Sequence, residues 1–203
     1  VQMGRRLANR QVEVGLRARD RFYELTVLTA DRPFLFASLT GVLAAWGMNI
    51  LKADAFANRS GIVLDTFRFA DLFRTLELNP SEIGRLRENV SEVVTGKTSL
   101  RDLMRGRIDF QFRPPTKVRI SPQVRFDDIS SSHSTLLEII AQDCPGLLYQ
   151  VGSTLAQLGC NIDVALIDTE GQKVIDVFYL TAGGRKLDES LQRAIHEALL
   201  QQL

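Results

Sequence analysis

Hydrophobic residues recur along this chain with two spacings, at every second position in some segments and at every third or fourth position in others. The first spacing predicts strands, and the second predicts helices with one apolar face. In the first half, helical spacing runs from Leu35 to Trp46 and ends at Gly47, a residue type that commonly terminates helices. A second helix is expected to begin at Pro80, after an N-cap at Asn79. Strands are predicted at residues 22–29, 49–56 and 62–70.

The same series of elements returns further along the chain. A shift of 112 positions, reduced to 111 after a one-residue deletion, aligns identical residues throughout the two halves. The aligned pairs are Val12 with Val124, Leu25 with Leu137, Asp31 with Asp143, Pro33 with Pro145, Leu35 with Leu147, Leu43 with Leu155, Ala44 with Ala156, Gly47 with Gly159, Asn49 with Asn161, Ile50 with Ile162, Ala53 with Ala165, Val63 with Val174, Asp65 with Asp176 and Phe67 with Phe178. The second half should carry strands near 135–142, 162–168 and 173–181 and helices near 146–158 and 188–201, so two copies of one domain are expected.

Each copy so far has the order β-α-β-β-α, which is one strand short of a four-stranded ferredoxin-like sheet. The segments QVEVGLRAR at 11–19 and QVRFDD at 123–128 stand at matching positions ahead of the copies, and each would form a hairpin with the next strand. We therefore predict an α+β fold of two tandem ferredoxin-like domains, each a four-stranded antiparallel sheet with two helices in the permuted order ββαββα. The predicted division is an N-terminal linker at 1–10, a first domain at 11–95, a connector at 96–122 with a short helix near 99–105, and a second domain at 123–203.

Composition argues against several classes of partner. Lys and Arg number 25 against 24 Asp and Glu, so no strong field favours nucleic acid or an anionic membrane. No apolar run is long enough for a membrane span and no signal peptide opens the chain, so we expect a cytoplasmic protein. The initial Val1 suggests a piece excised from a longer protein. Cys144 and Cys160 are too few for a disulfide framework and are expected to be packing residues.

The turn before the first helix of each copy is the expected binding site. Pro33 and Pro145 disfavour helix in the preceding residue, so each helix begins beyond its proline and leaves free backbone N–H groups that suit a carboxylate. Gly146 would let a ligand approach the backbone closely. Asn49 and Asn161 begin the next strand, which we expect to be the neighbouring edge of the same copy's site, where an amide can donate to a carboxylate and accept from an ammonium. The candidate ligand-binding residues are Asp31, Phe34, Leu35, Asn49, Ile50, Asp143, Gly146, Leu147, Asn161 and Ile162.

A purely structural role for the same residues stays open, because Asp can cap a turn, Gly can permit it and Asn can close a helix exit. Their joint recurrence at one shift favours a site. Asp65 and Asp176 also recur within apolar strands, but about 111 positions separate them. Structural hydrogen bonding or an inter-domain contact is therefore expected of them rather than a shared carboxylate pair.

No catalytic residue, metal or cofactor is expected in the chain itself. The two histidines, His133 and His196, are followed by Ser134 and Glu197, so the sequence holds no His-Asp pair of a metal phosphohydrolase. The sequence also lacks a Gly-Ser followed by Asp-x-Asp, with which a nucleotidyltransferase holds its metal ions.

The repeated turn resembles that of ACT domains, small ferredoxin-like regulatory modules that bind amino acids, usually at an interface between two copies. The D/N-x-P-G-L turn and later G-x-N-I of that family correspond to DCPGLL with LGCNI, and to DRPFLF with WGMNI. Phe34 departs from the general pattern, and an aromatic side chain there could block a ligand. The resemblance implies that ligand contacts come from Asp31, Asn49, Asp143 and Asn161 and from the backbone at Phe34, Leu35, Gly146 and Leu147.

A narrower resemblance covers nearly the whole chain. DRPFLF, LDTF, PTKVRISPQVRFDD, DCPGLLYQVG and IDVFYLT occur in an order similar to the C-terminal region of bacterial PII uridylyltransferase/uridylyl-removing enzymes, in which an aromatic after D-R-P is familiar. The resemblance implies nucleotidyltransferase and HD phosphohydrolase domains ahead of the chain, with Mg in the catalytic domains. It further implies that the paired ACT domains sense glutamine and shift the balance between uridylylating and deuridylylating the PII protein. The oligomeric state stays open, with a homodimer through the ACT domains as one candidate.

Two other functions remain open at this point. One is a ligand-free interaction or oligomerisation module, and the other is an ACT pair of a different amino-acid metabolic enzyme, such as a biosynthetic dehydrogenase. Within the sensing hypothesis we expect the second copy, with its DCPGLL turn, to be the better site. Asn161→Ala should then weaken ligand binding more than Asn49→Ala.

Overall fold

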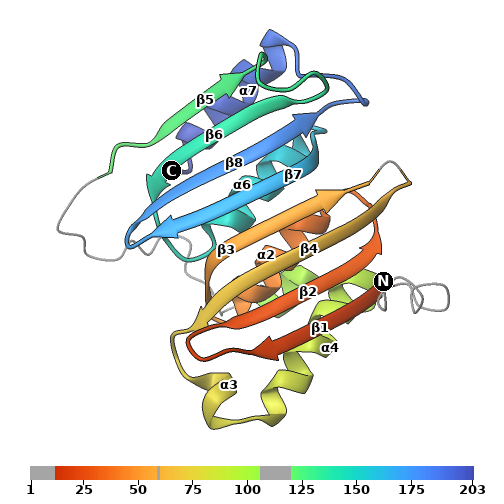
Figure 1. Cartoon of the computed structure of the whole chain (residues 1–203), viewed down its shortest axis with the longest axis vertical. Helices are drawn as coiled ribbons and strands as arrows, with labels where there is room; N and C mark the ends of the chain where they lie inside the picture. Colours follow the sequence, from red (N-terminus) through yellow and green to blue (C-terminus); the bar gives the residue numbers. More distant parts are fainter. Residues whose placement is uncertain (1–11, 59, 106–119) are drawn as a thin grey trace.

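The computed structural model describes residues 12–58, 60–105 and 120–203, and within them each repeat has the predicted order ββαββα (Figure 1). The first repeat comprises β1 (Val12–Ala18), β2 (Tyr23–Ala30), α2 (Leu35–Ala45), β3 (Met48–Ala57), β4 (Ile62–Asp71), α3 (Thr75–Leu78) and α4 (Ser81–Thr95), followed by α5 (Leu100–Met104). The second comprises β5 (Gln123–Asp127), β6 (Thr135–Gln142), α6 (Leu147–Gln157), β7 (Asn161–Glu170), β8 (Lys173–Thr181) and α7 (Glu189–Leu200). The predicted α+β class and the added leading strand of each copy are confirmed.

The two repeats share one antiparallel sheet of eight strands in the order β1-β2-β4-β3-β7-β8-β6-β5 (Figure 1). Each leading strand pairs with the strand that follows it, β1 with β2 and β5 with β6. The repeats join where β3 pairs with β7 along Lys52–Phe56. We call this ladder the seam.

The seam follows an approximate two-fold symmetry. Asp54 lies opposite Leu166, its own counterpart at the shift of 112. On one side of that pair Lys52 lies opposite Asp168, and on the other side Phe56 lies opposite Val164, so the two outer pairs are also counterparts of each other. A self-matching contact of this kind is what a two-fold interface between identical subunits produces.

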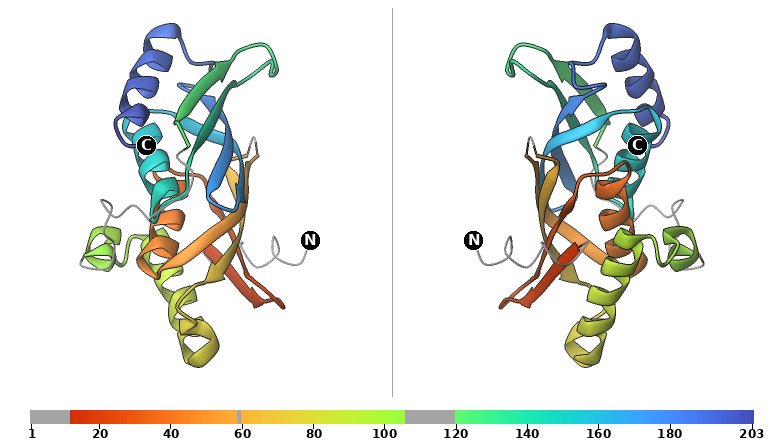
Figure 2. Two further views of the ribbon diagram at one scale, coloured as in Figure 1. Left: turned by 90° about the vertical axis from the view of Figure 1, so that its left-hand side faces the viewer. Right: turned by 90° about the vertical axis from the view of Figure 1, so that its right-hand side faces the viewer.

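All the described helices lie on one face of the sheet, and α2 and α6 pack side by side across the two repeats (Figure 2). Phe36 of α2 lies between two counterpart residues of the sheet, since its ring centroid is 5.9 Å from that of Phe67 and 5.9 Å from that of Phe178. Buried side chains of both repeats therefore form one continuous core.

Two local expectations about the first repeat are wrong. The helix α4 begins at Ser81 rather than Pro80, and Pro80 occupies the N-cap position that was expected of Asn79. The short helix α3 was not expected, and its first turn is held by the Asp71 carboxylate, which accepts from the backbone N–H groups of Thr75 at 3.0 Å and Leu76 at 2.6 Å. The expected linker at 1–10 and most of the connector lie outside the described residues.

Candidate functional site

Two clefts open at the seam, one beside each repeated turn. The first-turn cleft has a cavity volume of about 50 Å³, and the second-turn cleft about 40 Å³. The first is lined by Asp31–Ala37, Ala55, Phe56, Ala57, Val63, Asp65, Gly152, Ala156, Cys160, Asn161 and Ile162. The second is lined by Thr40, Ala44, Met48, Asn49, Ile50, Asp143–Tyr149, Ile167, Thr169 and Val174. All ten candidate residues therefore line one cleft or the other.

The asparagines are exchanged between the copies. Asn161 lines the cleft of the first turn and Asn49 lines that of the second, so the expectation that each asparagine completes the site of its own copy is wrong. The antiparallel seam explains the exchange, because it places the start of β3 beside the end of β7, where Thr169 Oγ1 donates to the Ile50 carbonyl at 3.3 Å. The hairpin between β7 and β8 also contacts the turn before α6, because the Asp143 N–H donates to the Gln172 carbonyl at 2.9 Å.

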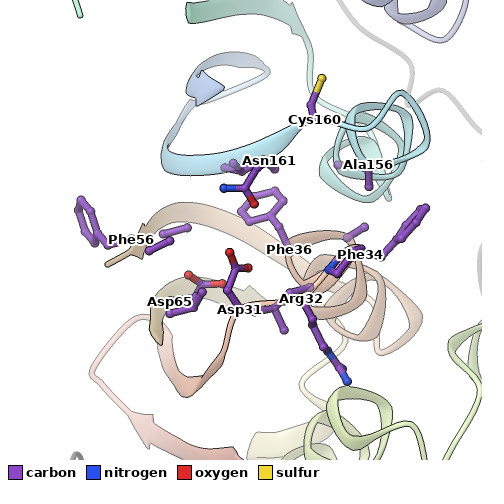
Figure 3. A pocket seen from close by; sticks show the side chains of 17 residues that line it. Asp31, Arg32, Phe34, Phe36, Phe56, Asp65, Ala156, Cys160 and Asn161 are labelled. Atoms are coloured by element: carbon purple, nitrogen blue, oxygen red, sulfur yellow. The ribbon is translucent and has the colours of Figure 1, made fainter. Parts of the chain in front are cut away.

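In each turn, the residue just before the helix has a left-handed backbone conformation. Gly146 has φ 77° and Phe34 has φ 64°, a conformation that costs a residue with a side chain about 1–2 kcal/mol. The Phe34 ring is 44% exposed and points away from Asp31 and Asn161, so it does not fill the cleft (Figure 3). The departure from Gly at this position therefore does not block the first turn.

The expected free amides are present at the start of α2. Among the described residues, the backbone N–H groups of Phe36 and Ala37 have no backbone acceptor, because α2 begins only at Leu35. Both residues line the first-turn cleft. This end of the cleft carries the partial positive charge of a helix N-terminus and can hold a carboxylate.

Two carboxylates lie at the opposite side of the same cleft. Figure 3 shows the side chains of Asp31 and Asp65 directed toward one another. Asp31 is exposed at the end of β2, whereas Asp65 on β4 is only 2% exposed. Burial raises the pKa of Asp65 to about 7, helped by the Asp31 carboxylate and opposed by the backbone N–H of Phe56. Burial also raises the pKa of Asp31, against the backbone N–H of Arg32 and with the help of Asp163.

The structural hydrogen bonds expected of the two buried aspartates are largely missing. Within the described residues, Oδ1 of Asp65 and both carboxylate oxygens of Asp176 accept no hydrogen bond, although the N–H groups of Phe56 and Asp168 lie near enough to lower the two pKa values. Asp176 is fully buried and has a pKa raised to about 8, mainly by burial and then by Asp143. Unlike Asp65, it is not among the residues that line a cleft.

Asn161 is held in one orientation by Asp163. Its Nδ2 donates to Asp163 Oδ1 at 2.9 Å, and Asp163 also accepts from Ser134 Oγ at 2.8 Å and Thr181 Oγ1 at 3.3 Å. The amide oxygen of Asn161 is thereby directed toward Asp31 (Figure 3). Both β7 and β3 shift register at this point, but the counterpart of Asp163 is Leu51, which cannot orient Asn49 in the same way.

The second-turn cleft carries one carboxylate of its own. Burial raises the pKa of Asp143 to about 6, while the backbone N–H of Cys144 lowers it. Burial likewise raises the pKa of Cys160, which lines the first cleft, to about 11, so its thiol stays protonated near neutral pH. Both cysteines are free thiols, buried or partly buried.

Sequence reasoning missed two residues of the first-turn region, namely Asp65, which lines the cleft, and Asp163, which holds the Asn161 amide. Asp65 was noted as a repeated aspartate but was not assigned to the site, and Asp163 was not noted at all. An ionisable residue within an apolar strand was the available signal for both.

Neither metal-binding nor membrane-spanning features occur in the part of the chain that the structure describes. No three His, Cys, Asp or Glu side chains gather there in a group that could hold a metal ion. No helix in that part combines the length and hydrophobicity needed to cross a membrane.

Comparisons with known proteins point to one family. Residues 135–199 match the ACT domain family. A bifunctional uridylyltransferase/uridylyl-removing enzyme from Nitrobacter winogradskyi is 32% identical over 201 residues, which cover 98% of this chain and 21% of the relative. An enzyme of the same name from Gluconobacter oxydans is 33% identical over 186 residues, covering 89% of this chain and 19% of its own. The chain thus spans about a fifth of the length of these curated relatives.

Among solved structures, an aspartate kinase from Synechocystis is similar over 90% of this chain and 27% of its own, with a TM-score of 0.48 and 16% identity.

Proposed function

Given that this chain is an ACT-domain region homologous, at about 30% identity and over nearly its full length, to the C-terminal part of bifunctional uridylyltransferase/uridylyl-removing enzymes, we propose that it is their amino-acid sensor. Its ligand is glutamine. Through the sensor, glutamine controls how the parent enzyme uridylylates and deuridylylates the PII signalling protein, in catalytic domains that use Mg and lie outside this chain.

The observation that carries the proposal is the crossed construction of the two clefts. Each cleft takes its turn from one repeat and its asparagine from the other. In the first cleft, the free amides of Phe36 and Ala37 suit a carboxylate, and the acceptors Asp31 and Asp65 suit an ammonium. A free amino acid carries both groups on one carbon atom.

A ligand in either cleft therefore contacts both repeats at once. Binding can shift the arrangement of the repeats only if the ligand binds one arrangement more tightly than another. A ligand held across the seam meets this condition, since a change in the seam moves one half of the site relative to the other. The attached catalytic domains can respond to that change through ordinary linkage.

The size of the clefts supports a coupling of this kind. A cavity of about 50 Å³ has room for roughly three or four waters, fewer heavy atoms than a glutamine molecule. A glutamine molecule seated wholly between these walls would therefore widen the cleft. Because the walls belong to different repeats, widening changes their relation at the seam.

The test is a thermal-shift titration of the chain with glutamine, with glutamate, serine and leucine as comparisons. A metabolite sensor with a Kd of about 1 mM gains about 1.4 kcal/mol of stability at about 10 mM ligand. For a chain of this size the Tm should rise by about 3–6 °C with glutamine. Glutamate is the sharpest control, because it differs only in replacing the carboxamide by a carboxylate. Absence of any shift with all four amino acids would contradict the proposal.

A ligand-free interaction module is the second candidate function. No described helix covers the other face of the sheet (Figure 2). Phe56, Leu64 and Leu166 are exposed apolar residues near the seam, and each alternates with residues buried under the helices. Exposed apolar groups of this kind often mark protein contacts. Light scattering with and without glutamine separates the two functions, since an interaction module would associate equally in both conditions.

A further inference from the structure

We propose that Asp65 is the residue that recognises the α-ammonium group of the ligand in the first-turn cleft, together with Asp31 and the amide oxygen of Asn161; this rests on the amino-acid-binding function proposed above. The three acceptors come from different elements, β4, the end of β2 and the start of β7. They meet only because the seam brings the second repeat against the first turn.

The first step is the orientation of the acceptors. Figure 3 shows the carboxylates of Asp31 and Asp65 facing one another beneath Asn161. The Nδ2 of Asn161 is committed to Asp163 at 2.9 Å, so its oxygen is the atom left for a ligand. This wall of the cleft therefore presents oxygen acceptors, which match the three N–H donors of an ammonium group.

The second step is that one carboxylate oxygen of Asp65 lacks a hydrogen-bond donor among the described residues. Its side chain is 2% exposed, and its Oδ1 has no hydrogen-bond partner within the described residues. A buried polar atom without a partner costs about 1–3 kcal/mol. An ammonium group in the cleft supplies the missing donor and a compensating charge together.

The third step is that, among the described residues lining the cleft, no cation competes for Asp65. Arg32 is the basic residue among those that line the cleft, and its guanidinium is turned toward α4, where Nη2 donates to the Val93 carbonyl at 3.1 Å (Figure 3). Of the groups packed around Asp65, the carboxylate of Asp31 and the backbone N–H of Phe56 influence its charge, and Asp163 acts on Asp31. The local charge is therefore negative and favours a cationic group.

The counterpart position provides a matched control. Asp176 is equally buried in the second repeat, but it does not line the second-turn cleft, and Asn49 has Leu51 where Asn161 has Asp163. The proposal thus assigns ammonium recognition to Asp65 and not to Asp176.

The experiment is isothermal titration calorimetry of the 203-residue chain with glutamine and with glutaramic acid, which keeps the carboxamide and carboxylate but lacks the α-ammonium. We expect Asp65→Asn to weaken glutamine binding at least about 10-fold, the effect of losing one charge-assisted contact of about 1.4 kcal/mol. Asp176→Asn should change it less than about 3-fold. Glutaramic acid should bind the wild-type chain at least about 10-fold more weakly than glutamine.

A proton-release measurement on the wild-type chain keeps the test independent of how the variants fold. Burial raises the pKa of Asp65 to about 7, so an ammonium beside it should expel part of a proton, and the binding enthalpy at pH 7 should differ between phosphate and Tris buffers. Equal binding of glutamine and glutaramic acid, equal effects of the two Asn variants, or a buffer-independent enthalpy would each overturn the role of Asp65 while leaving glutamine sensing intact. If glutamine, glutamate, serine and leucine all fail to bind the wild-type chain, the proposed function itself is overturned.

Discussion

Asp54 of β3 lies directly opposite Leu166 of β7, the residue that occupies the same position in the second repeat. The pair marks the approximate two-fold axis about which the strand pairings of the seam repeat, Lys52 with Asp168 on one side and Phe56 with Val164 on the other. The same axis relates the two clefts. Each copy therefore supplies the turn of one cleft and the asparagine of the other, and neither copy forms a complete cleft by itself. The candidate ligand-binding clefts and the contact that holds the repeats together are therefore parts of the same surface.

Phe36 should contribute more to stability than its neighbour Phe34. Phe36 is 6% exposed between Phe67 and Phe178, whereas Phe34 is 44% exposed. We expect Phe36→Ala to lower the free energy of unfolding by about 3–5 kcal/mol, and Phe34→Ala by less than about 1 kcal/mol. Urea denaturation followed by circular dichroism measures both. Similar losses for the two variants would mean that the aromatic cluster does not hold the repeats together.

Gly152 should be intolerant of even a methyl group. A Cβ at this position of α6 would lie 3.0 Å from Cδ1 of Phe36 and 3.4 Å from Cα of Ala37, at the crossing of α6 with α2. Gly152→Ala is expected to destabilise the chain by about 1–3 kcal/mol through overpacking. Gly84→Ala is the control, because nothing lies within 4 Å of its Cβ, and alanine in helix α4 should stabilise by about 0.5–1 kcal/mol. Differential scanning calorimetry should show Tm changes of opposite sign.

Asp176 makes the stability depend on pH. Its pKa is raised from 3.8 to about 8 in the folded chain, so between these values the folded state binds more protons than the unfolded state. The free energy of unfolding therefore falls as the pH rises from about 4 to about 8, and Asp65 acts in the same direction up to about 7. Asp176→Asn should raise the Tm, and the gain should grow from pH 5 to pH 9 by about 3 °C or more. A gain that is the same at both pH values would show that Asp176 ionises normally.

Double-mutant cycles test the exchange of asparagines between the copies. Asp65 and Asn161 line the same cleft, while Asn49 lines the other. The effects of Asp65→Asn and Asn161→Ala on glutamine binding should couple by about 0.5 kcal/mol or more, whereas Asp65→Asn and Asn49→Ala should be additive within about 0.5 kcal/mol. Calorimetric Kd values for the single and double variants give both coupling energies. Coupling of Asp65 with Asn49 instead would contradict the crossed arrangement.

Asp163 should act on the ligand mainly through Asn161, with a smaller electrostatic effect through Asp31. Asp163→Ala removes the acceptor that fixes the Asn161 amide, so glutamine binding should weaken, by less than the loss in Asn161→Ala. In an Asn161→Ala background the same substitution should have little further effect. The Kd values of the two single variants and the double variant provide the measurement, and additive losses would assign Asp163 a separate role.

The repeat and the elements within it were predictable because they depend on local pattern. The alternating apolar positions of the strands, the helix stop at Gly47 and the recurrence at one shift each involve residues that are close in sequence or at aligned positions. The leading strands were also predictable, since a ferredoxin-like sheet needs four. The short helix at Thr75–Leu78 escaped because a single turn held by Asp71 leaves no periodicity to detect.

The composition of the clefts could not be predicted in the same way. Whether Asn161 serves its own copy or the other depends on the pairing of β3 with β7, and the strands' own sequences are equally compatible with separate sheets. The burial of Asp65 beside a cleft, without a partner for Oδ1, likewise depends on contacts between distant segments. Sequence periodicity places a residue on a face of a strand, but it does not show what stands opposite that face.

The crossed clefts also explain why the two copies sit on one polypeptide. A single repeat would supply only half of each proposed binding site. It would have to associate with a second copy of the repeat before it could bind a ligand. Joining the copies in one chain replaces that bimolecular encounter by an intramolecular one. The response of the proposed sensor would then be independent of how much of the protein the cell makes.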